Sequence, residues 1–182
     1  MGGRELVRGR MGTEMTRAIE TVLGWAERLR ATLERARWLP PLLVRLFVGY
    51  FFFETGLGKI RNLGPFVERF QEWGLPFPAV SAAASAYTEL VGGALIVLGL
   101  FTRLASVPLF VNMLVATLTV KLKKVGGLDD FVELDEPLYA LSFLWLFISG
   151  PGPVSLDALA TRLLRRRATK ATPLGAPKVS EP

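Results

Sequence analysis

The chain has 182 residues, of which 51% are hydrophobic, with a mean hydropathy of +0.37 and a formal net charge of +6. Its length allows one domain, and its composition is too apolar for a disordered chain and high for a soluble one. The lack of cysteine and histidine excludes disulfides, thiol redox relays, cysteine-ligated iron–sulfur clusters, and haem or zinc held by imidazole.

Residues 1–40 are predicted to form a cytoplasmic segment that contains one amphipathic helix. Residues 16–38 have helical periodicity, and most charges lie off an apolar stripe formed by Ile19, Val22, Leu23, Ala26, Leu29 and Leu33. This segment is too charged to span a membrane, so we expect it to lie along the lipid headgroups with Trp38 at the interface. Packing against a partner protein is the alternative. Pro40 and Pro41 are predicted to break the helix.

Four apolar stretches follow within residues 41–157. Three of them cover residues 41–59, 79–101 and 104–121, and the weaker fourth extends from Glu136 to Ser149. About 20 apolar residues are enough to cross a bilayer core of about 30 Å. We therefore predict an all-α fold, a polytopic four-helix membrane bundle preceded by the amphipathic interfacial helix. Residues 158–182 are predicted to be a basic, largely disordered cytoplasmic tail.

The lysines and arginines are distributed unevenly around the apolar stretches. Fifteen lie before Pro41, in the connection that contains Arg103, and after Ser155, whereas the other two connections carry six. By the positive-inside rule, this pattern predicts an integral protein of the inner (plasma) membrane with both termini in the cytoplasm. Because the basic residues flank apolar stretches in this way, we do not expect nucleic acid as a partner.

Two of the predicted spans carry a carboxylate in mid-span, Glu54 in the first and Glu89 in the second. Ionisable groups inside a membrane are costly, which makes them candidates for a functional site or for packing. Each span also has a face of polar and small residues, namely Arg45, Gly49, Phe52, Gly56 and Lys59, and then Glu89, Gly92, Ile96, Gly99 and Arg103. At 100° per residue, Glu54 lies about 180° around its helix from Arg45, so these two residues cannot share a face.

The candidate site residues are Arg45, Glu54, Lys59, Glu89 and Tyr139. They could contact a polar head group or move protons, and a structural ion pair between helices is the equal alternative. Glu89 should be either neutral or paired with a cation such as Arg45 or Lys59, and we expect the neutral form. The sequence shows no metal-ligand spacing, no nucleophile–base pair and no phosphate-binding loop.

Several short motifs occur in a recognisable order. They are Arg45 with G-x6-G-x-G-K over residues 49–59, GLPFP over 74–78, ELxGG over 89–93, LGLFTR over 98–103, Glu136, and GPGPVSLD over 150–157. Together they resemble the DoxX family of small four-helix integral membrane proteins. The resemblance implies an association with membrane oxidoreductase assemblies, and a related branch forms a subunit of thiosulfate:quinone oxidoreductase. The chain departs from thiol-redox four-helix quinone reductases because it has no CxxC motif.

The resemblance leaves two main functional classes open. One is a non-catalytic accessory subunit, with a structural or assembly role, of a membrane oxidoreductase or respiratory complex. The other is a subunit that binds quinone or quinol through its intramembrane carboxylates, with quinone as a non-covalent cofactor and no covalently bound one. A small-solute transporter is less favoured, because a bundle of this size would have to oligomerise. Catalysis by the chain alone is not expected, and the expected partners are the lipid bilayer and other membrane-complex subunits.

Overall fold

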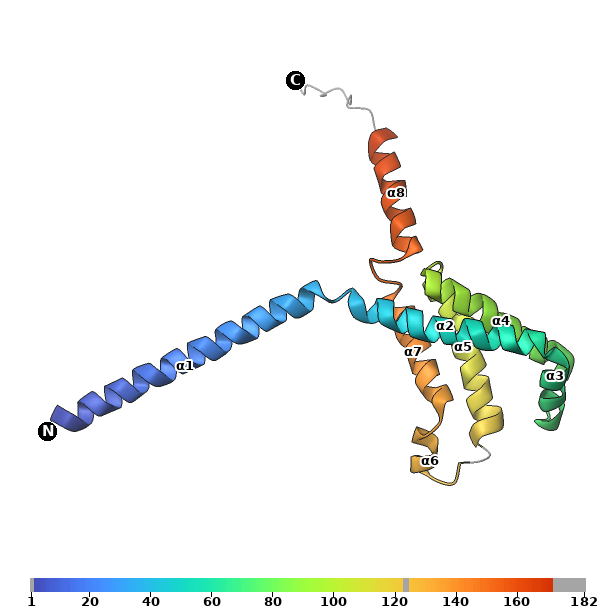
Figure 1. The fold of residues 1–182 in the computed structure, drawn as a ribbon, viewed down its shortest axis with the longest axis horizontal. Helices are drawn as coiled ribbons and strands as arrows, with labels where there is room; N and C mark the ends of the chain where they lie inside the picture. The colour runs from blue at the N-terminus through green and yellow to red at the C-terminus, as the bar shows by residue number, and fades with distance from the viewer. Residues whose placement is uncertain (1, 123–124, 172–182) are drawn as a thin grey trace, which may run out of the picture. The chain divides into compact units, whose positions relative to one another are not determined.

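The computed structural model describes residues 2–122 and 125–171, with side chains over most of residues 17–167. All regular elements in these residues are helical, which confirms the predicted all-α fold (Figure 1). In chain order they are α1 (Gly2–Arg35), α2 (Leu39–Arg61), α3 (Leu63–Glu72), α4 (Pro78–Leu98), α5 (Thr102–Ala116), the π-helical turn η1 (Thr117–Lys121), α6 (Leu128–Val132), α7 (Asp135–Ser149) and α8 (Leu156–Ala171).

Residues 1–39 form one unit, and residues 40–182 form another. In the first unit, α1 begins well before the predicted start at residue 16 and ends three residues before Trp38. The side chains of its apolar stripe are exposed, including Val22, Leu29 and Leu33. The stripe therefore stays available to a lipid surface or to a partner, as the sequence pattern indicates.

The chain has a helix break just before Pro40 and Pro41, which are predicted to separate the amphipathic helix from the first span. A turn over residues 36–38 separates α1 from α2, while Pro40 and Pro41 belong to the first turn of α2. Proline is accepted there because the first backbone N–H groups of a helix have no partner inside the helix. Because a proline inside a helix clashes with the carbonyl four residues before it, the two prolines fit the helix break that the sequence predicts before the first span.

Three helical segments in the described residues are long and apolar enough to cross a membrane. They are Leu39–Arg61, Pro78–Leu98 and Thr102–Lys121, in agreement with the first three predicted spans. Helix α7 has 15 residues, which gives a length of about 22 Å at 1.5 Å per residue. Because this is shorter than a bilayer core of about 30 Å, the fourth span stays a prediction.

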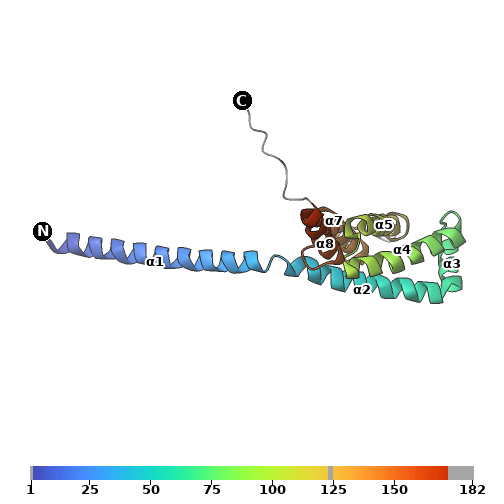
Figure 2. The ribbon, with the colours of Figure 1, turned by 90° about the horizontal axis from the view of Figure 1, so that it is seen from above.

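The second unit is a bundle in which α2 lies beside α4 and α5 lies beside α7 (Figure 2). Its core is formed by Phe52, Ile96, Ala105, Leu109, Met113, Ala140, Phe143 and Leu146, which come from all four of these helices. Two glycines allow the close approach of α2 to α4. A Cβ atom on Gly56 would overlap the backbone of Leu90, and one on Gly93 would overlap the backbone of Phe53.

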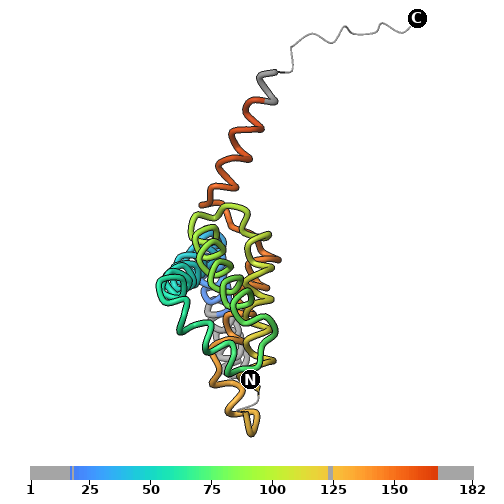
Figure 3. Tube along the Cα trace, turned by 90° about the vertical axis from the view of Figure 1, so that its right-hand side faces the viewer, coloured from blue at the N-terminus to red at the C-terminus, as the bar shows by residue number. Residues whose placement is uncertain are grey.

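Helix α3 runs crosswise from the end of α2 and packs against the first half of α4 (Figure 1 and Figure 3). A second apolar cluster holds it there, formed by Phe66 and Phe70 from α3 and by Ala82 and Ala86 from α4. The turn that follows α3 needs Gly74, whose φ of +72° lies in the left-handed region. Aromatic rings thus gather on one side of the bundle, close to where Lys59 ends the predicted first span.

The tail is more ordered than predicted. Helix α8 covers Leu156–Ala171, so a largely disordered segment from residue 158 is wrong for its first part. Leucine, alanine and arginine are among the strongest helix formers, and Leu156, Leu159 and Leu163 are spaced as on one helix face. The remainder of the predicted tail, residues 172–182, lies outside the described residues.

Candidate functional site

Arg45 is buried in α2, with only 2% of its surface exposed. Its guanidinium donates hydrogen bonds to four backbone carbonyl oxygens. They belong to Ile96 (3.0 Å) and Val97 (3.1 Å) at the end of α4, and to Pro151 (2.5 Å) and Val154 (2.8 Å) after α7. The rigid fork of five N–H donors suits this task. Arg45 therefore connects α2 to the end of α4 and to the segment after α7 by hydrogen bonds.

The segment over residues 150–157, here called the clasp, makes a second connection through Asp157. Its carboxylate accepts hydrogen bonds from the backbone N–H groups of Phe101 (3.0 Å) and Thr102 (3.3 Å) at the start of α5. Its own N–H donates to the carbonyl oxygen of Gly99 (3.0 Å). Phe101 has a φ of +49°, which is costly for a residue with a side chain. Asp157 thus stabilises a strained turn at the start of a helix.

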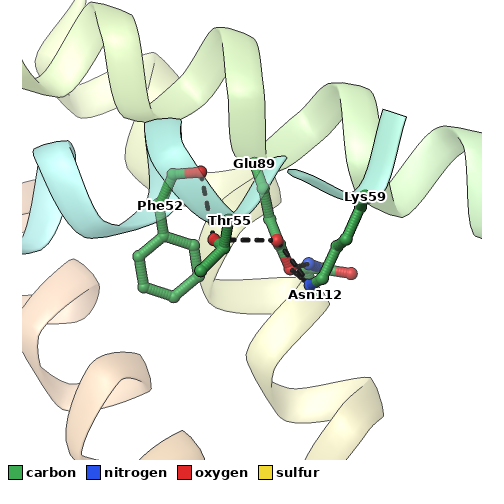
Figure 4. Close-up of polar contacts among 5 residues, drawn as sticks. All are labelled: Phe52, Thr55, Lys59, Glu89 and Asn112. Carbon is green, nitrogen blue, oxygen red and sulfur yellow. Dashed lines mark hydrogen bonds and ion pairs between the residues drawn. The ribbon is translucent and has the colours of Figure 1, made fainter. Parts of the chain in front are cut away.

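Glu89 is the centre of a polar cluster between α2, α4 and α5 (Figure 4). It is 1% exposed, and both of its carboxylate oxygens contact Nζ of Lys59, at 2.6 and 2.5 Å. Asn112 donates to Oε1 at 2.9 Å, and the Thr55 hydroxyl lies 3.3 Å from Oε2. Both oxygens of this buried carboxylate therefore have partners, as a buried charge requires.

A cavity of about 750 Å³ lies beside this cluster, and Glu89, Lys59, Thr55 and Asn112 all help to line it. Aromatic rings form much of the remaining wall, namely Phe51, Phe52, Phe66, Phe70, Trp73 and Tyr139. Cavities that bind small molecules have volumes of about 300–1,000 Å³, and they are mostly apolar with a few polar groups that fix the ligand's orientation. This cavity has both properties.

A second ion pair lines the same cavity. Nζ of Lys121 lies 2.7 Å from Oε1 of Glu136, which joins η1 to the first turn of α7. In a regular α-helix, Lys121 would lie about 180° away from Asn112, since the two are nine residues apart. The π-helical turn η1 is wider than an α-helical turn, so the chain rotates around the helix axis by a smaller angle at each residue. The smaller rotation brings the side of the helix that carries Lys121 closer to the side that faces the cavity, and Lys121 helps to line it.

The structure brings three of the five sequence-predicted site residues together. Glu89, Lys59 and Tyr139 line the cavity, and the Tyr139 ring stacks on Phe51 with 5.0 Å between the ring centroids. Arg45 belongs to the clasp contacts instead, and Glu54 is exposed on the outer face of α2. Nζ of Lys59 contacts both carboxylate oxygens of Glu89, which is the pairing with a cation that the sequence predicts as the alternative to a neutral carboxyl group.

Two members of the cluster, Thr55 and Asn112, are absent from the predicted site. Thr55 lies one helical turn before Lys59, so the spacing of four residues could have indicated it. Asn112 is the only amide in the third predicted span, and uncharged polar groups in such a span commonly bond to another helix.

The bundle that carries this site matches a known family. The model of the DoxX family matches residues 41–122, which include the polar cluster around Glu89. The chain belongs to the DoxX family. The family match agrees with the resemblance of the short motifs to the DoxX family. The chain is therefore a membrane protein.

This DoxX-family chain is also similar to individual proteins. It is 35% identical over 148 residues to an uncharacterised membrane protein of Mycobacterium tuberculosis, covering 71% of this chain and 85% of the relative. It is 38% identical over 116 residues to CatD of Bacillus subtilis, whose name calls it a candidate oxidoreductase, covering 64% of this chain and 83% of the relative. No solved structure matches the chain significantly.

Proposed function

We propose that this DoxX-family protein is a non-catalytic membrane subunit of an oxidoreductase assembly, and that it holds a quinone or quinol in the cavity beside Glu89. The observation that carries the proposal is an aromatic-walled cavity with an intramembrane polar cluster at its wall. The oxidoreductase name of the Bacillus subtilis relative supports the redox context. The chain has no cysteine or histidine, so the electrons would come from a partner that carries a redox group.

The charges and hydrogen-bond donors around the cavity suit a neutral molecule with carbonyl groups. The lining contains three cations, Lys59, Arg69 and Lys121, and three carboxylates, Glu89, Asp135 and Glu136, so the formal charges cancel. Asn112 uses one N–H on Glu89 and has a second one to offer. A quinone carbonyl would accept that hydrogen bond while the quinone ring packs against the aromatic wall.

A substitution that fills the cavity tests this proposal. In Ser85→Phe, a ring replaces a small side chain that lines the cavity, and we expect the affinity for short-chain benzoquinone and naphthoquinone analogues to fall about tenfold or more. Val91→Phe is the matched control, because Val91 is exposed on the same helix and does not line the cavity. The measurement is quinone binding to the full chain in nanodiscs. Wild-type protein that binds neither analogue would contradict the proposal.

The saturated hydrogen bonding of Glu89 favours one alternative. A carboxylate whose oxygens all have partners within the protein also suits a purely structural subunit without a ligand. Such a subunit would copurify with redox-carrying proteins, and its complex would keep full activity in the Ser85→Phe variant.

We also propose that both termini face the cytoplasm and that the protein resides in the inner (plasma) membrane. The connection after Lys121 carries fewer cations than acids, whereas the terminal segments are rich in arginine. Since the chain has no cysteine, Gly126→Cys introduces a unique thiol into this connection. We expect a membrane-impermeant maleimide to label it in intact cells, and labelling only after permeabilisation would reverse the proposed topology.

A further inference from the structure

Glu54 is an exposed carboxylate within a helix that is long and apolar enough to cross a membrane. It forms none of the ion pairs or hydrogen bonds found among the described residues, whereas Glu89 and Glu136 each contact a lysine. Large apolar side chains are exposed on the same helix, including Phe47 and Phe53. A carboxyl group on such a surface would face lipid unless another helix covers it.

The position of Glu54 along α2 places it inside the apolar part of a membrane. It lies 15 residues after Leu39 and seven before Arg61, which is about 22 Å and about 10 Å from the two ends of the helix. Carboxyl groups inside a membrane almost always face other protein groups or a water-filled cavity. The outer face of α2 therefore needs a protein partner.

Three residues on this face have the spacing and chemistry of a contact between helices. Tyr50, Glu54 and Gly58 follow one another at intervals of four residues, so they form one row along α2. Tyr50 is 59% exposed, and a Cβ atom on Gly58 would meet no atom within 4 Å. Unlike Gly56, then, Gly58 is not needed for packing within the chain. Small residues beside polar ones are the usual contact between membrane helices.

We propose that a second copy of this chain docks on the row formed by Tyr50, Glu54 and Gly58. Two copies inserted in the same direction, related by a two-fold axis along the membrane normal, bring equivalent residues together at equal depth. One Glu54 carboxylic acid can then donate to the other, and each Tyr50 hydroxyl lies one turn away as a further donor. Gly58 lets the two backbones approach closely. The face thus supplies its own complementary groups.

Disulfide crosslinking in native membranes tests the contact directly, because the chain contains no cysteine. We expect Gly58→Cys to give a disulfide-linked homodimer after mild oxidation. The control is Val91→Cys, since Val91 is 53% exposed on α4 and lies away from the proposed row; it should give at most one fifth of the Gly58→Cys yield. Equal yields, or no dimer from Gly58→Cys, would overturn the proposal, as would a crosslink only to another protein.

The role of the carboxyl group is tested in the Gly58→Cys background. An added Glu54→Gln should retain at least half of the dimer, because paired amides can also hydrogen bond across two helices. An added Glu54→Leu should reduce the dimer about fivefold, although leucine is better suited to lipid. Photobleaching of labelled full-length protein in liposomes gives the independent measure, with two steps expected for wild type and one for Glu54→Leu. A wild-type monomer at all protein densities, or a Glu54→Leu dimer of wild-type yield, would overturn the proposal.

Discussion

Replacing Arg45 with methionine is expected to lower the free energy of unfolding by about 3 kcal/mol or more. The guanidinium is buried and satisfies carbonyl oxygens at the end of α4 and in the clasp. Methionine offers no donor, and each buried acceptor left without a partner costs about 1–3 kcal/mol. The clasp would also lose its attachment to α2. Thermal and denaturant unfolding in mild detergent measure the effect.

Two further arginine variants show whether the effect comes from the fork of donors. Arg45→Lys keeps the charge but cannot reach four carbonyl oxygens with one ammonium group, so we expect most of the loss to remain. Arg103→Met should change stability little, because Arg103 is exposed and its contact with the Ile148 carbonyl is long, at 3.3 Å. A fully stable Arg45→Lys would show that charge alone suffices, and a fully stable Arg45→Met would refute the role of the clasp.

Glu89→Gln is expected to destabilise the bundle by about 2–3 kcal/mol. The amide removes the charge that pairs with Lys59. Its NH₂ group is a donor, and it would take the place of an oxygen that accepts hydrogen bonds from Lys59 and Thr55. Removing one partner of a buried ion pair costs about 3–5 kcal/mol. The Lys59 side chain is 29% exposed, so water can solvate the remaining ammonium group in part and the loss should be smaller.

A double-mutant cycle separates the ion pair from ordinary packing. Lys59→Met alone should destabilise by a similar amount, because Glu89 then stays buried without its cation. The double variant Glu89→Gln with Lys59→Met should lose clearly less than the sum of the single losses. Unfolding in detergent again provides the measurement. Additive losses would mean that the two side chains contribute independently, despite their contact of 2.5 Å.

The buried faces of α2 and α4 could be predicted well from the spacing of small and polar residues in the sequence. Intervals of three and four residues put Arg45, Gly49, Phe52 and Gly56 on one face of the first span, and all four are buried in α2. The same argument finds the buried residues Glu89, Gly92 and Ile96 of α4. The spacing argument does not find Gly93. This glycine lies against the backbone of α2, whereas its neighbour Gly92 faces Leu109 of α5. A single periodic stripe describes one neighbour, whereas α4 has neighbours on several sides.

The division of the charged residues into separate sites could not be predicted. Arg45 and Lys59 lie on the same helix face, and both were candidates to pair with Glu89. In the structure Glu89 forms its ion pair with Lys59, whereas Arg45 donates hydrogen bonds to carbonyl oxygens of residues up to 109 positions away in the chain. Every residue has a backbone carbonyl, so no residue type in the sequence marks such an acceptor. The π-helical turn that directs Lys121 toward the cavity also has no signal in residue spacing.

The clasp has a consequence for how the protein is made. Arg45 is synthesised 106 residues before Pro151, whose carbonyl it binds. At about 5–20 residues per second, a ribosome needs about 5–20 s to cover that interval. During this time the two clasp carbonyls that Arg45 binds do not yet exist, although those of Ile96 and Val97 are made about halfway through the interval. A nascent chain that stops before the clasp therefore leaves Arg45 with two of its four carbonyl acceptors, those at the end of α4.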